Sequence, residues 1–174
     1  MTETPAKPRV YLAGPGVFRP EPKLFGEQLK EKCDRAGLHG CFPLDNEIDG
    51  DADPQEIATA IYRANVDLIN SAQAIIADIS PFRGPNMDPG TAWEIGYGIA
   101  RGLPVFAWTS DASLLLERTR RHGQGGTNGL DTAGWTIENF DLVENLMIAI
   151  SAASIHDSDD DAIAACAAAL RKVC

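Results

Sequence analysis

The sequence lacks the segments by which a chain enters or crosses a membrane. None of its apolar runs approaches the ~20 residues that a membrane-spanning helix needs. The opening stretch, MTETPAKPRV, has no apolar centre of the kind found in secretory signal peptides. These two absences predict a cytoplasmic protein without a membrane partner.

Cysteine is scarce, and its spacing suits neither a disulfide framework nor a metal site. The 174 residues contain four cysteines, with no CxxC pair and no Cys/His spacing typical of zinc. The three histidines lie far apart in the sequence, and we assign none of them a catalytic role. We expect reduced, mostly buried thiols and no metal. The cysteines are Cys33, Cys41, Cys166 and Cys174.

Positive charge and nucleotide-binding loops are also in short supply. The formal net charge is −10, whereas affinity for a nucleic-acid polymer comes from Lys and Arg that neutralise phosphates. No GxGxxG and no GxxxxGK[ST] is present, which argues against a nicotinamide or ATP cofactor. The acidic field does not affect a small uncharged ligand, so we expect such a ligand, no nucleic-acid partner and no cofactor.

Short apolar runs alternate with helical patterns along the chain. This alternation predicts a parallel sheet covered by helices on both faces, within one domain over residues 9–174 behind a flexible tail, residues 1–8. The expected strands are 10–13, 38–44, 74–78, 104–108 and a short last one at 154–156, and the expected helices are 22–36, 54–70, 91–101 and 158–173.

The segment between the fourth and fifth expected strands is harder to interpret. We predict a short helix at 114–121 and a helical or buried segment at 142–150. The Gly-rich residues 123–129 are a loop, and a lid and a plain surface loop remain equal alternatives. Trp135 and Phe140 can stack on a nucleobase, but we expect both in the core.

Three carboxylates gather near one predicted strand end, in the stretch ADISPFRGPNMDPGTAWEIGYG (77–98). Asp78 ends the strand, Asp88 lies in a loop rich in Pro and Gly, and Glu94 lies at the start of the next helix. Ligands of open α/β sheets bind at this edge. Acids around a cleft, without a metal pattern, suggest chemistry on a glycosidic bond, in which one ionised carboxylate attacks and one protonated acid assists the leaving group.

Each of these acids also has a structural interpretation. Glu94 can close a capping box with Thr91, Asp88 can form a turn before Pro89, and Asp78 can cap the following loop. The helix dipole is expected to keep Glu94 ionised, which suits a nucleophile. One of the crowded acids is expected to have a raised pKa.

Two further features bear on Glu94. Gly96 and Gly98 on the same helix allow close packing. Tyr11, near the end of the first strand, is either a packing residue or the group that orients Glu94, because the first and third strands of such sheets are often neighbours.

Taken together, these residues resemble the nucleoside 2-deoxyribosyltransferase family. The resemblance extends from about residue 11 to residue 150, and the block around Glu94 is its most specific part. The long segment between Trp108 and Asn145 departs from the family pattern and leaves the preference for purine or pyrimidine open. The matching pieces are YLAGP (11–15), DISPFRG (78–84), DPGTAWEIG (88–96) and NLM (145–147).

The resemblance implies a flavodoxin-like three-layer α/β/α sandwich around a parallel five-stranded sheet. It also implies base exchange on 2′-deoxyribonucleosides by a ping-pong route with net retention at C1′, using deoxynucleosides and free nucleobases and neither metal nor organic cofactor. Glu94 is then the nucleophile, Tyr11 orients it, and Asp78 and Asp88 contact the base, one of them as the acid.

The remaining implied site residues contact substrate or a neighbouring subunit. Gly14, Pro15 and Phe18 are expected to contact the substrate. Asn145 and Met147 are expected to complete the site of a neighbour, so that the active unit is a homo-oligomer, at least a dimer. Three alternatives remain open: an N-glycosidase acting on deoxynucleosides or their 5′-monophosphates, a non-catalytic nucleoside-binding module, and a plain structural domain.

Overall fold

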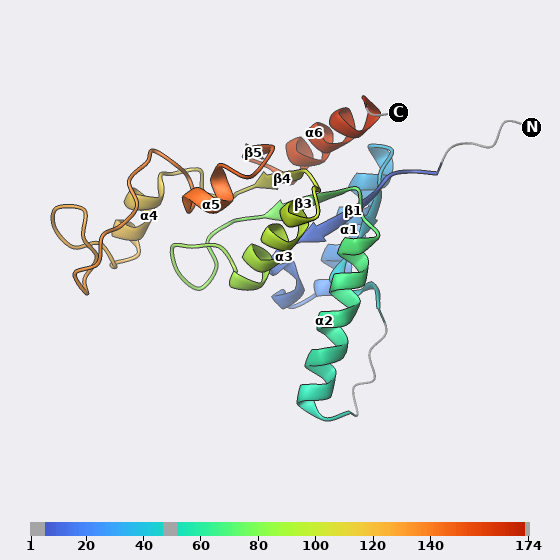
Figure 1. The fold of residues 1–174 in the computed structure, drawn as a ribbon, viewed down its shortest axis with the longest axis horizontal. Coiled ribbons are helices and arrows are strands. Elements are labelled where there is room, and N and C mark those ends of the chain that lie inside the picture. Colours follow the sequence, from blue (N-terminus) through green and yellow to red (C-terminus); the bar gives the residue numbers. More distant parts are fainter. Residues whose placement is uncertain (1–5, 47–51, 173–174) are drawn as a thin grey trace, which may run out of the picture.

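A five-stranded, all-parallel sheet forms the centre of the protein (Figure 1). The structure, a computed structural model, describes residues 6–46 and 52–172. The strand order is β2-β1-β3-β4-β5, so the first and third strands are neighbours, as expected. The strands are β1 (Arg9–Ala13), β2 (His39–Cys41), β3 (Ala74–Asp78), β4 (Val105–Trp108) and β5 (Ser154–His156).

Alternate residues of the central strands enter two separate hydrophobic cores. In β1, Val10 and Leu12 pack on one face of the sheet, whereas Tyr11 and Ala13 pack on the other. Side chains of a strand point alternately to opposite faces, and both faces are buried here. This explains why the three central strands, β1, β3 and β4, are apolar at nearly every position, as in other covered parallel sheets.

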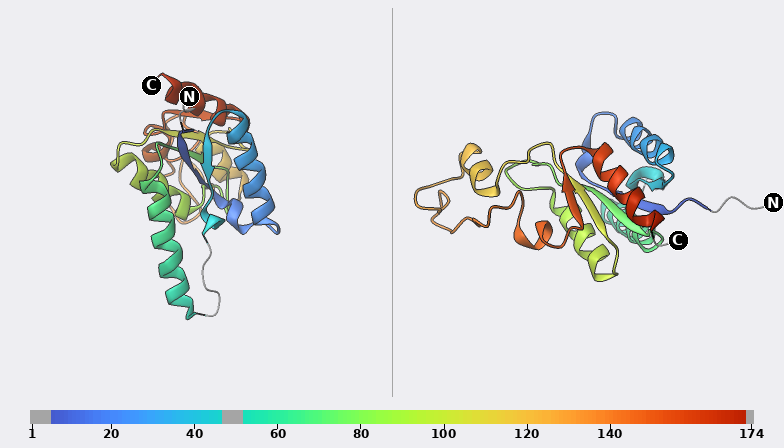
Figure 2. Two further views of the ribbon diagram at one scale, coloured as in Figure 1. Left: turned by 90° about the vertical axis from the view of Figure 1, so that its right-hand side faces the viewer. Right: turned by 90° about the horizontal axis from the view of Figure 1, so that it is seen from above.

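Helices cover both faces, which confirms the flavodoxin-like three-layer sandwich (Figure 2). One face carries α1 (Pro22–Arg35) and α6 (Asp159–Arg171). The other carries α2 (Pro54–Asn70) and α3 (Pro89–Ala100), with the short α5 (Leu146–Ala149) beside α3.

The second strand is shorter than the sequence pattern predicts. The expected strand at 38–44 ends at Cys41, and a 3-10 turn, η2 (Pro43–Asp45), follows. Pro43 has no backbone N–H and cannot continue a ladder of hydrogen bonds, so the apolar pattern extends past the end of the strand.

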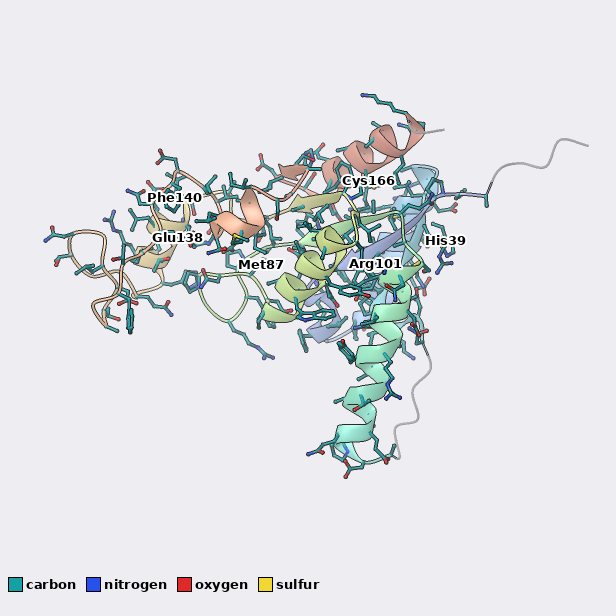
Figure 3. The ribbon with its side chains drawn as sticks, viewed as in Figure 1. His39, Met87, Arg101, Glu138, Phe140 and Cys166 are labelled. Atoms are coloured by element: carbon teal, nitrogen blue, oxygen red, sulfur yellow. The ribbon has the colours of Figure 1, made fainter. Side chains whose placement is uncertain are left out.

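The connection between β4 and β5 leaves the body of the protein and forms a lobe, residues 111–145, that contains α4 (Leu115–Arg121) (Figure 1). In Figure 3, Glu138 and Phe140 lie on this lobe. Trp135 and Phe140 are 74% and 62% exposed, so the expectation that they pack in the core is wrong. Both rings remain in solvent.

The Gly-rich part of the lobe is a loop, as predicted. Two isolated bridges, Gly125 with Asp131 and Leu130 with Thr136, hold it in a series of turns.

The cysteines that the structure describes are free and buried. Burial raises the pKa of the Cys33 and Cys166 thiols to about 12, and Cys41 is likewise buried. Cys174 and the first five residues of the expected tail lie outside the described residues. Residues 6–8 precede β1 without regular structure, and the Pro8 carbonyl accepts a hydrogen bond from the His39 N–H.

Over residues 6–46 and 52–172, no helix combines the length and the apolar character needed to span a membrane.

Candidate active site

The strand order places a crevice at the carboxyl ends of β1 and β3. After β1 the chain turns through η1 (Pro15–Phe18) towards α1 on one face, and after β3 it continues into α3 on the other face. Neighbouring strands whose connections leave in opposite directions form the usual binding crevice of an open α/β sheet. The fold therefore places Gly14 and Asp78 at its edge.

Gly14 is required where these two strands end. Its φ is +149°, and a Cβ atom there would lie 2.7 Å from the Cβ of Asp78. Only glycine permits this close approach of the chain to Asp78.

A cavity of about 780 Å³ opens beside Gly14, within the usual size range of small-molecule sites. We call it the Glu94 cavity. Val17, Phe18 and Ile61 contribute apolar walls. The polar lining residues are Lys23, Asn46, Asn65, Asp88, Thr91 and Glu94.

Glu94 in this cavity is bonded to a buried tyrosine. The hydroxyl of Tyr11, which is fully buried in β1, donates to Glu94 Oε1 at 2.6 Å. Tyr11 is thus both a packing residue and the partner of Glu94, and burial raises the pKa of its hydroxyl. The contact leaves Glu94 Oε2 without a tyrosine partner.

The pKa of Glu94 is raised to about 7, chiefly because burial disfavours the charged form. The Tyr11 hydrogen bond opposes this shift, and the charge of Asp88 adds to it. The expectation that the helix dipole holds Glu94 ionised is therefore wrong. Helix α3 begins at Pro89, so Glu94 lies in its second turn, beyond the reach of the N-terminal dipole.

Asp88, not Thr91, caps α3. Its carboxylate accepts hydrogen bonds from the N–H of Thr91 at 2.9 Å and from the Thr91 hydroxyl at 3.1 Å. The predicted capping box between Thr91 and Glu94 is therefore not formed, and the Glu94 side chain has no capping role. Asp88 both caps the helix and lines the Glu94 cavity.

Asp78 lies outside this cavity. It is buried at the end of β3, its carboxylate accepts from the Ser80 N–H at 2.9 Å, and burial is the main cause that raises its pKa. It lines an adjacent cavity of about 320 Å³ together with Pro15, whereas Phe18 lines both cavities. Asp78 and Glu94 therefore lie on two sides of the η1 segment.

Among residues 6–46 and 52–172, no group of three or more His, Cys, Asp or Glu side chains is arranged to hold a metal ion.

The chain is similar to known sequences and to solved structures. Residues 10–147 match the family described as nucleoside 2-deoxyribosyltransferase. The chain belongs to this family. A curated relative, an uncharacterized protein of Schizosaccharomyces pombe, is 32% identical over 157 residues, which cover 80% of this chain and 74% of the relative.

Solved structures of similar proteins have the same fold. A 2-desoxiribosyltransferase from Leishmania mexicana is 30% identical, with a TM-score of 0.76 over 92% of this chain and 97% of that one. A 2-deoxyribosyltransferase from Bacillus psychrosaccharolyticus is 20% identical, with a TM-score of 0.57 over 88% of each chain, and shows the likeness of fold alone.

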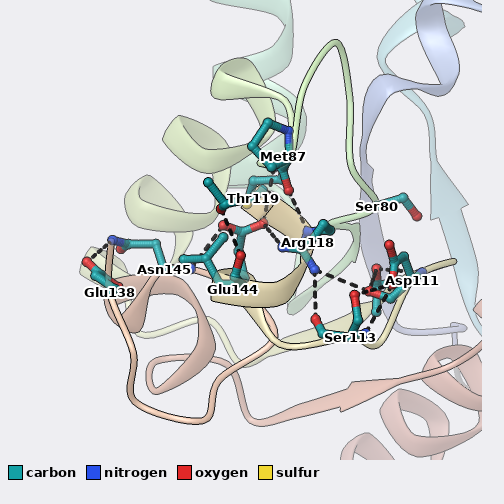
Figure 4. A network of polar contacts seen from close by, with 12 residues as sticks. Ser80, Met87, Asp111, Ser113, Arg118, Thr119, Glu138, Glu144 and Asn145 are labelled. Atoms are coloured by element: carbon teal, nitrogen blue, oxygen red, sulfur yellow. Dashed lines mark hydrogen bonds and ion pairs between the residues drawn. The ribbon is translucent and has the colours of Figure 1, made fainter. Parts of the chain in front are cut away.

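Two residues that the family resemblance brings to the site lie elsewhere in this subunit. Asn145 caps α5: its Oδ1 accepts from the Met147 N–H at 3.0 Å, and its Nδ2 donates to Glu138 at 2.6 Å (Figure 4). Met147 is 70% exposed. Neither side chain lines the Glu94 cavity of its own chain, nor does the Gly-rich loop.

Phe18, which lines the Glu94 cavity, belongs to an aromatic stack that continues into the adjacent cavity. Phe18 stacks on Phe82 with ring centroids 5.4 Å apart. The Arg83 guanidinium lies 5.2 Å from the ring centroid of Phe18 and 4.7 Å from that of Phe82. Arg83 adopts φ 57°, a left-handed conformation that is uncommon outside glycine.

Sequence reasoning missed Lys23 and Asn65 as cavity residues. For Asn65 a signal was present, since it follows Ile61 by four residues on an otherwise apolar helix face. For Lys23 there was none, because exposed lysines are common at the start of helices.

Proposed function

We propose that the protein exchanges the base of 2′-deoxyribonucleosides through a covalent deoxyribosyl intermediate on Glu94. One observation carries the proposal: a carboxylate oriented by a buried tyrosine hydroxyl lies in the wall of a cavity of substrate size, in a member of this family. The substrates are deoxynucleosides and free nucleobases.

The chemistry requires two displacements at C1′. In the first, Glu94 Oε2 forms a bond to C1′, the C1′–N bond breaks, and its electron pair leaves with the base, which takes a proton from an acid. In the second, the incoming base nitrogen attacks C1′, its proton returns to the acid, and the carboxylate departs. Two inversions give net retention, and splitting the exchange in this way lowers each barrier.

A pKa near 7 suits a carboxylate that attacks C1′ in the first displacement and leaves it in the second. A carboxyl with a pKa of about 7 ionises near neutral pH, so the nucleophile is available. Tyr11 holds one oxygen, which fixes the direction of the other.

Two acids compete for the role of proton donor. Asp88 shares the cavity with Glu94, whereas Asp78 has the raised pKa that favours a protonated form. The variants Asp88→Asn and Asp78→Asn distinguish them: loss of the donor slows a poor leaving group far more than a chemically activated one.

We further propose that the active unit is at least a dimer, in which Asn145 and Met147 reach the site of a neighbouring copy. Support comes from the exposure of Met147 and from the place of both residues outside the cavity of their own subunit.

A hydrolase acting on deoxynucleoside 5′-monophosphates is a second candidate, favoured by Lys23 in the Glu94 cavity. A phosphate pairs readily with such a cation. Arg19 and Arg83 are engaged with aromatic rings instead. Incubation with a deoxynucleoside and a second base separates the candidates, because the transferase forms a new nucleoside whereas the hydrolase releases free sugar.

A covalent test addresses the nucleophile directly. Protein incubated with a 2′-deoxynucleoside and quenched in acid should carry a deoxyribosyl group on Glu94, detected by peptide mass spectrometry. Glu94→Ala should lose the label and the exchange, and a control at the exposed Glu56, Glu56→Ala, should keep both. Full exchange by Glu94→Ala would remove the assignment, and ligand binding without any turnover by the wild type would indicate a non-catalytic module.

A further inference from the structure

Asn65, which lines the Glu94 cavity, carries an unpartnered polar atom. The Oδ1 atom of Asn65 is shielded from solvent, and no donor in the described parts of the chain reaches it. Over residues 6–46 and 52–172 it is the one buried side-chain nitrogen or oxygen in this state. Buried polar groups nearly always have a partner, so an exception beside a cavity points to a ligand.

The position of Asn65 on α2 makes it a part of the site. Ile61, one helical turn earlier, lines the cavity, and Ile69, one turn later, is fully buried in the core that also contains Tyr11. Asn65 therefore lies where this helix face passes from the core to the cavity. Asp88 and Glu94 line the same cavity.

The donors that line the Glu94 cavity, Lys23 and Asn46 among them, do not bond to Asn65 Oδ1. The Tyr11 hydroxyl is used by Glu94, and the Thr91 hydroxyl is used by Asp88. The carboxyl groups of Asp88 and Glu94 do not bond to Asn65 Oδ1 either. The missing donor is best supplied by the substrate.

We propose that Asn65 is a specificity-determining residue for the proposed base exchange, and that its carboxamide oxygen accepts a hydrogen bond from the bound deoxynucleoside. The proposal rests on the function proposed above. The last torsion of an asparagine side chain is broad, so the carboxamide can turn its oxygen towards the cavity at little cost. The donor is either a sugar hydroxyl or a base N–H.

The first test replaces the carboxamide by an apolar group of similar size. Asn65→Leu should raise KM for 2′-deoxyadenosine about tenfold, as expected for one lost hydrogen bond that leaves a substrate donor unpaired. Its melting temperature should equal or exceed that of the wild type, because an unpaired buried oxygen is removed. Asn65→Asp keeps an acceptor oxygen of the same reach and should restore KM to within about threefold.

Asn70 on the same helix provides the matched control. It is exposed and accepts from the Tyr97 hydroxyl at 2.9 Å, outside the cavity. Asn70→Leu should leave KM unchanged. An Asn65→Leu variant with unchanged KM and a lower melting temperature, or one that does not fold, would overturn the proposal, because the carboxamide would then serve the structure alone.

Substrate analogues identify the donor. The donors of 2′-deoxyadenosine are its exocyclic amine and its 3′ and 5′ hydroxyls, so purine 2′-deoxyriboside, 2′,3′-dideoxyadenosine and 2′,5′-dideoxyadenosine each lack one of them. The analogue that lacks the donor group bonded to Asn65 should bind the wild type and Asn65→Leu with equal affinity. A tenfold difference that persisted with all three analogues would refute the hydrogen bond.

Calorimetry separates this proposal from the proposed function. A wild type that bound 2′-deoxyadenosine without exchanging bases would contradict the function, and the affinity of Asn65→Leu would still decide the role of Asn65. A wild type that neither bound nor exchanged would overturn both.

Discussion

At Glu94, burial and a hydroxyl group act on one carboxyl in opposite directions. Burial raises its pKa to about 7, and the hydrogen bond from Tyr11 restrains the rise. The proton on this carboxyl therefore leaves near neutral pH, which makes the protonation state of Glu94 accessible to measurement.

The pH profile of exchange should report this proton. If the ionised carboxylate attacks, kcat/KM rises with pH and levels off above about 7. Tyr11→Phe removes the interaction that lowers the pKa and should move the rising limb upward by on the order of one pH unit. Tyr97→Phe, whose hydroxyl contacts Asn70 instead, should leave the limb in place. A limb centred near pH 4.5 in the wild type would contradict the raised pKa.

Folding stability should depend on the same proton. The pKa of Glu94 rises on folding from 4.5 to about 7, so the folded state holds a proton that the unfolded chain loses between these values. The contribution is full below pH 4.5 and is lost as the pH rises through 7. The side chain of Glu94→Gln does not titrate, so the variant does not lose this stability as the pH rises. Its free energy of unfolding relative to that of the wild type should therefore grow between pH 5 and pH 8 by on the order of 2 kcal/mol. Urea denaturation at both pH values checks this, and a constant difference would count against it.

At the scale of elements, one of the two glycines of α3 makes a close contact with β3. A Cβ at Gly98 would meet the Cδ1 atom of Ile75 at 2.2 Å, whereas a Cβ at Gly96 would meet nothing within 4 Å. The sequence-based interpretation that both glycines allow close packing is therefore confirmed for Gly98 and wrong for Gly96, which faces solvent.

These two glycines form a matched pair for mutation. Gly98→Ala should destabilise the protein by about 1 kcal/mol, since overpacking outweighs the better helix propensity of alanine. Gly96→Ala gains the propensity without the clash and should stabilise by about 0.5–1 kcal/mol. The double variant Gly98→Ala/Ile75→Val removes the obstructing methyl group and should recover part of the loss. Thermal unfolding measures all three, and equal effects of the two single variants would contradict the packing argument.

A buried ion pair inside the lobe also bonds to the loop before Asp88. The side chains of Arg118 and Glu144 are 1% and 2% exposed, and Arg118 Nη2 lies 3.0 Å from Glu144 Oε2 (Figure 4). Arg118 also donates to the carbonyl of Pro85, and Glu144 accepts from the N–H groups of Met87 and Asn145. The pair thus fixes the segments that lead into Asp88 and into α5.

Breaking this pair should cost far more than breaking an exposed one. Arg118→Met leaves Glu144 buried without its partner, so we expect a loss of about 3–5 kcal/mol in urea denaturation. Arg118→Met/Glu144→Leu should be less destabilised than the single variant, because no uncompensated charge remains. Arg121→Met, which removes a largely exposed ion pair with Asp111, should cost no more than about 1 kcal/mol. Equal losses at Arg118 and Arg121 would refute the difference.

At the scale of the whole molecule, the proposed oligomer predicts complementation between inactive chains. If Asn145 serves a neighbour, a mixed dimer of Glu94→Ala and Asn145→Ala contains one complete site. Randomly assembled mixtures should then regain about one quarter of wild-type activity, although each variant alone is inactive. Coexpression, with light scattering to confirm mixed assemblies, tests this. Mixed assemblies without activity would place Asn145 in the site of its own chain.

Much of the fold follows from local patterns in the sequence. Short stretches of chain encode the order of strands and helices, and they encode helix caps such as Asp53 and Ser158. They also encode the apolar residues that enter the two cores on either face of the sheet. In the lobe the predicted short helix at 114–121 is confirmed as α4, whereas the predicted core positions of Trp135 and Phe140 are wrong. Local patterns do not show how the lobe packs, which depends on contacts such as Arg118 with Glu144 that span 26 residues.

The sequence by itself determined the family, the parallel sheet and the closeness of Asp88 to Glu94, because strand ends and motif residues are local properties of the chain. Only the tertiary structure decided that Asp78 lies in a separate cavity, that Asn65 has no partner, and that burial outweighs the helix dipole at Glu94. Burial and partnership depend on which distant segments meet, and a pKa depends on the solvent that those segments exclude.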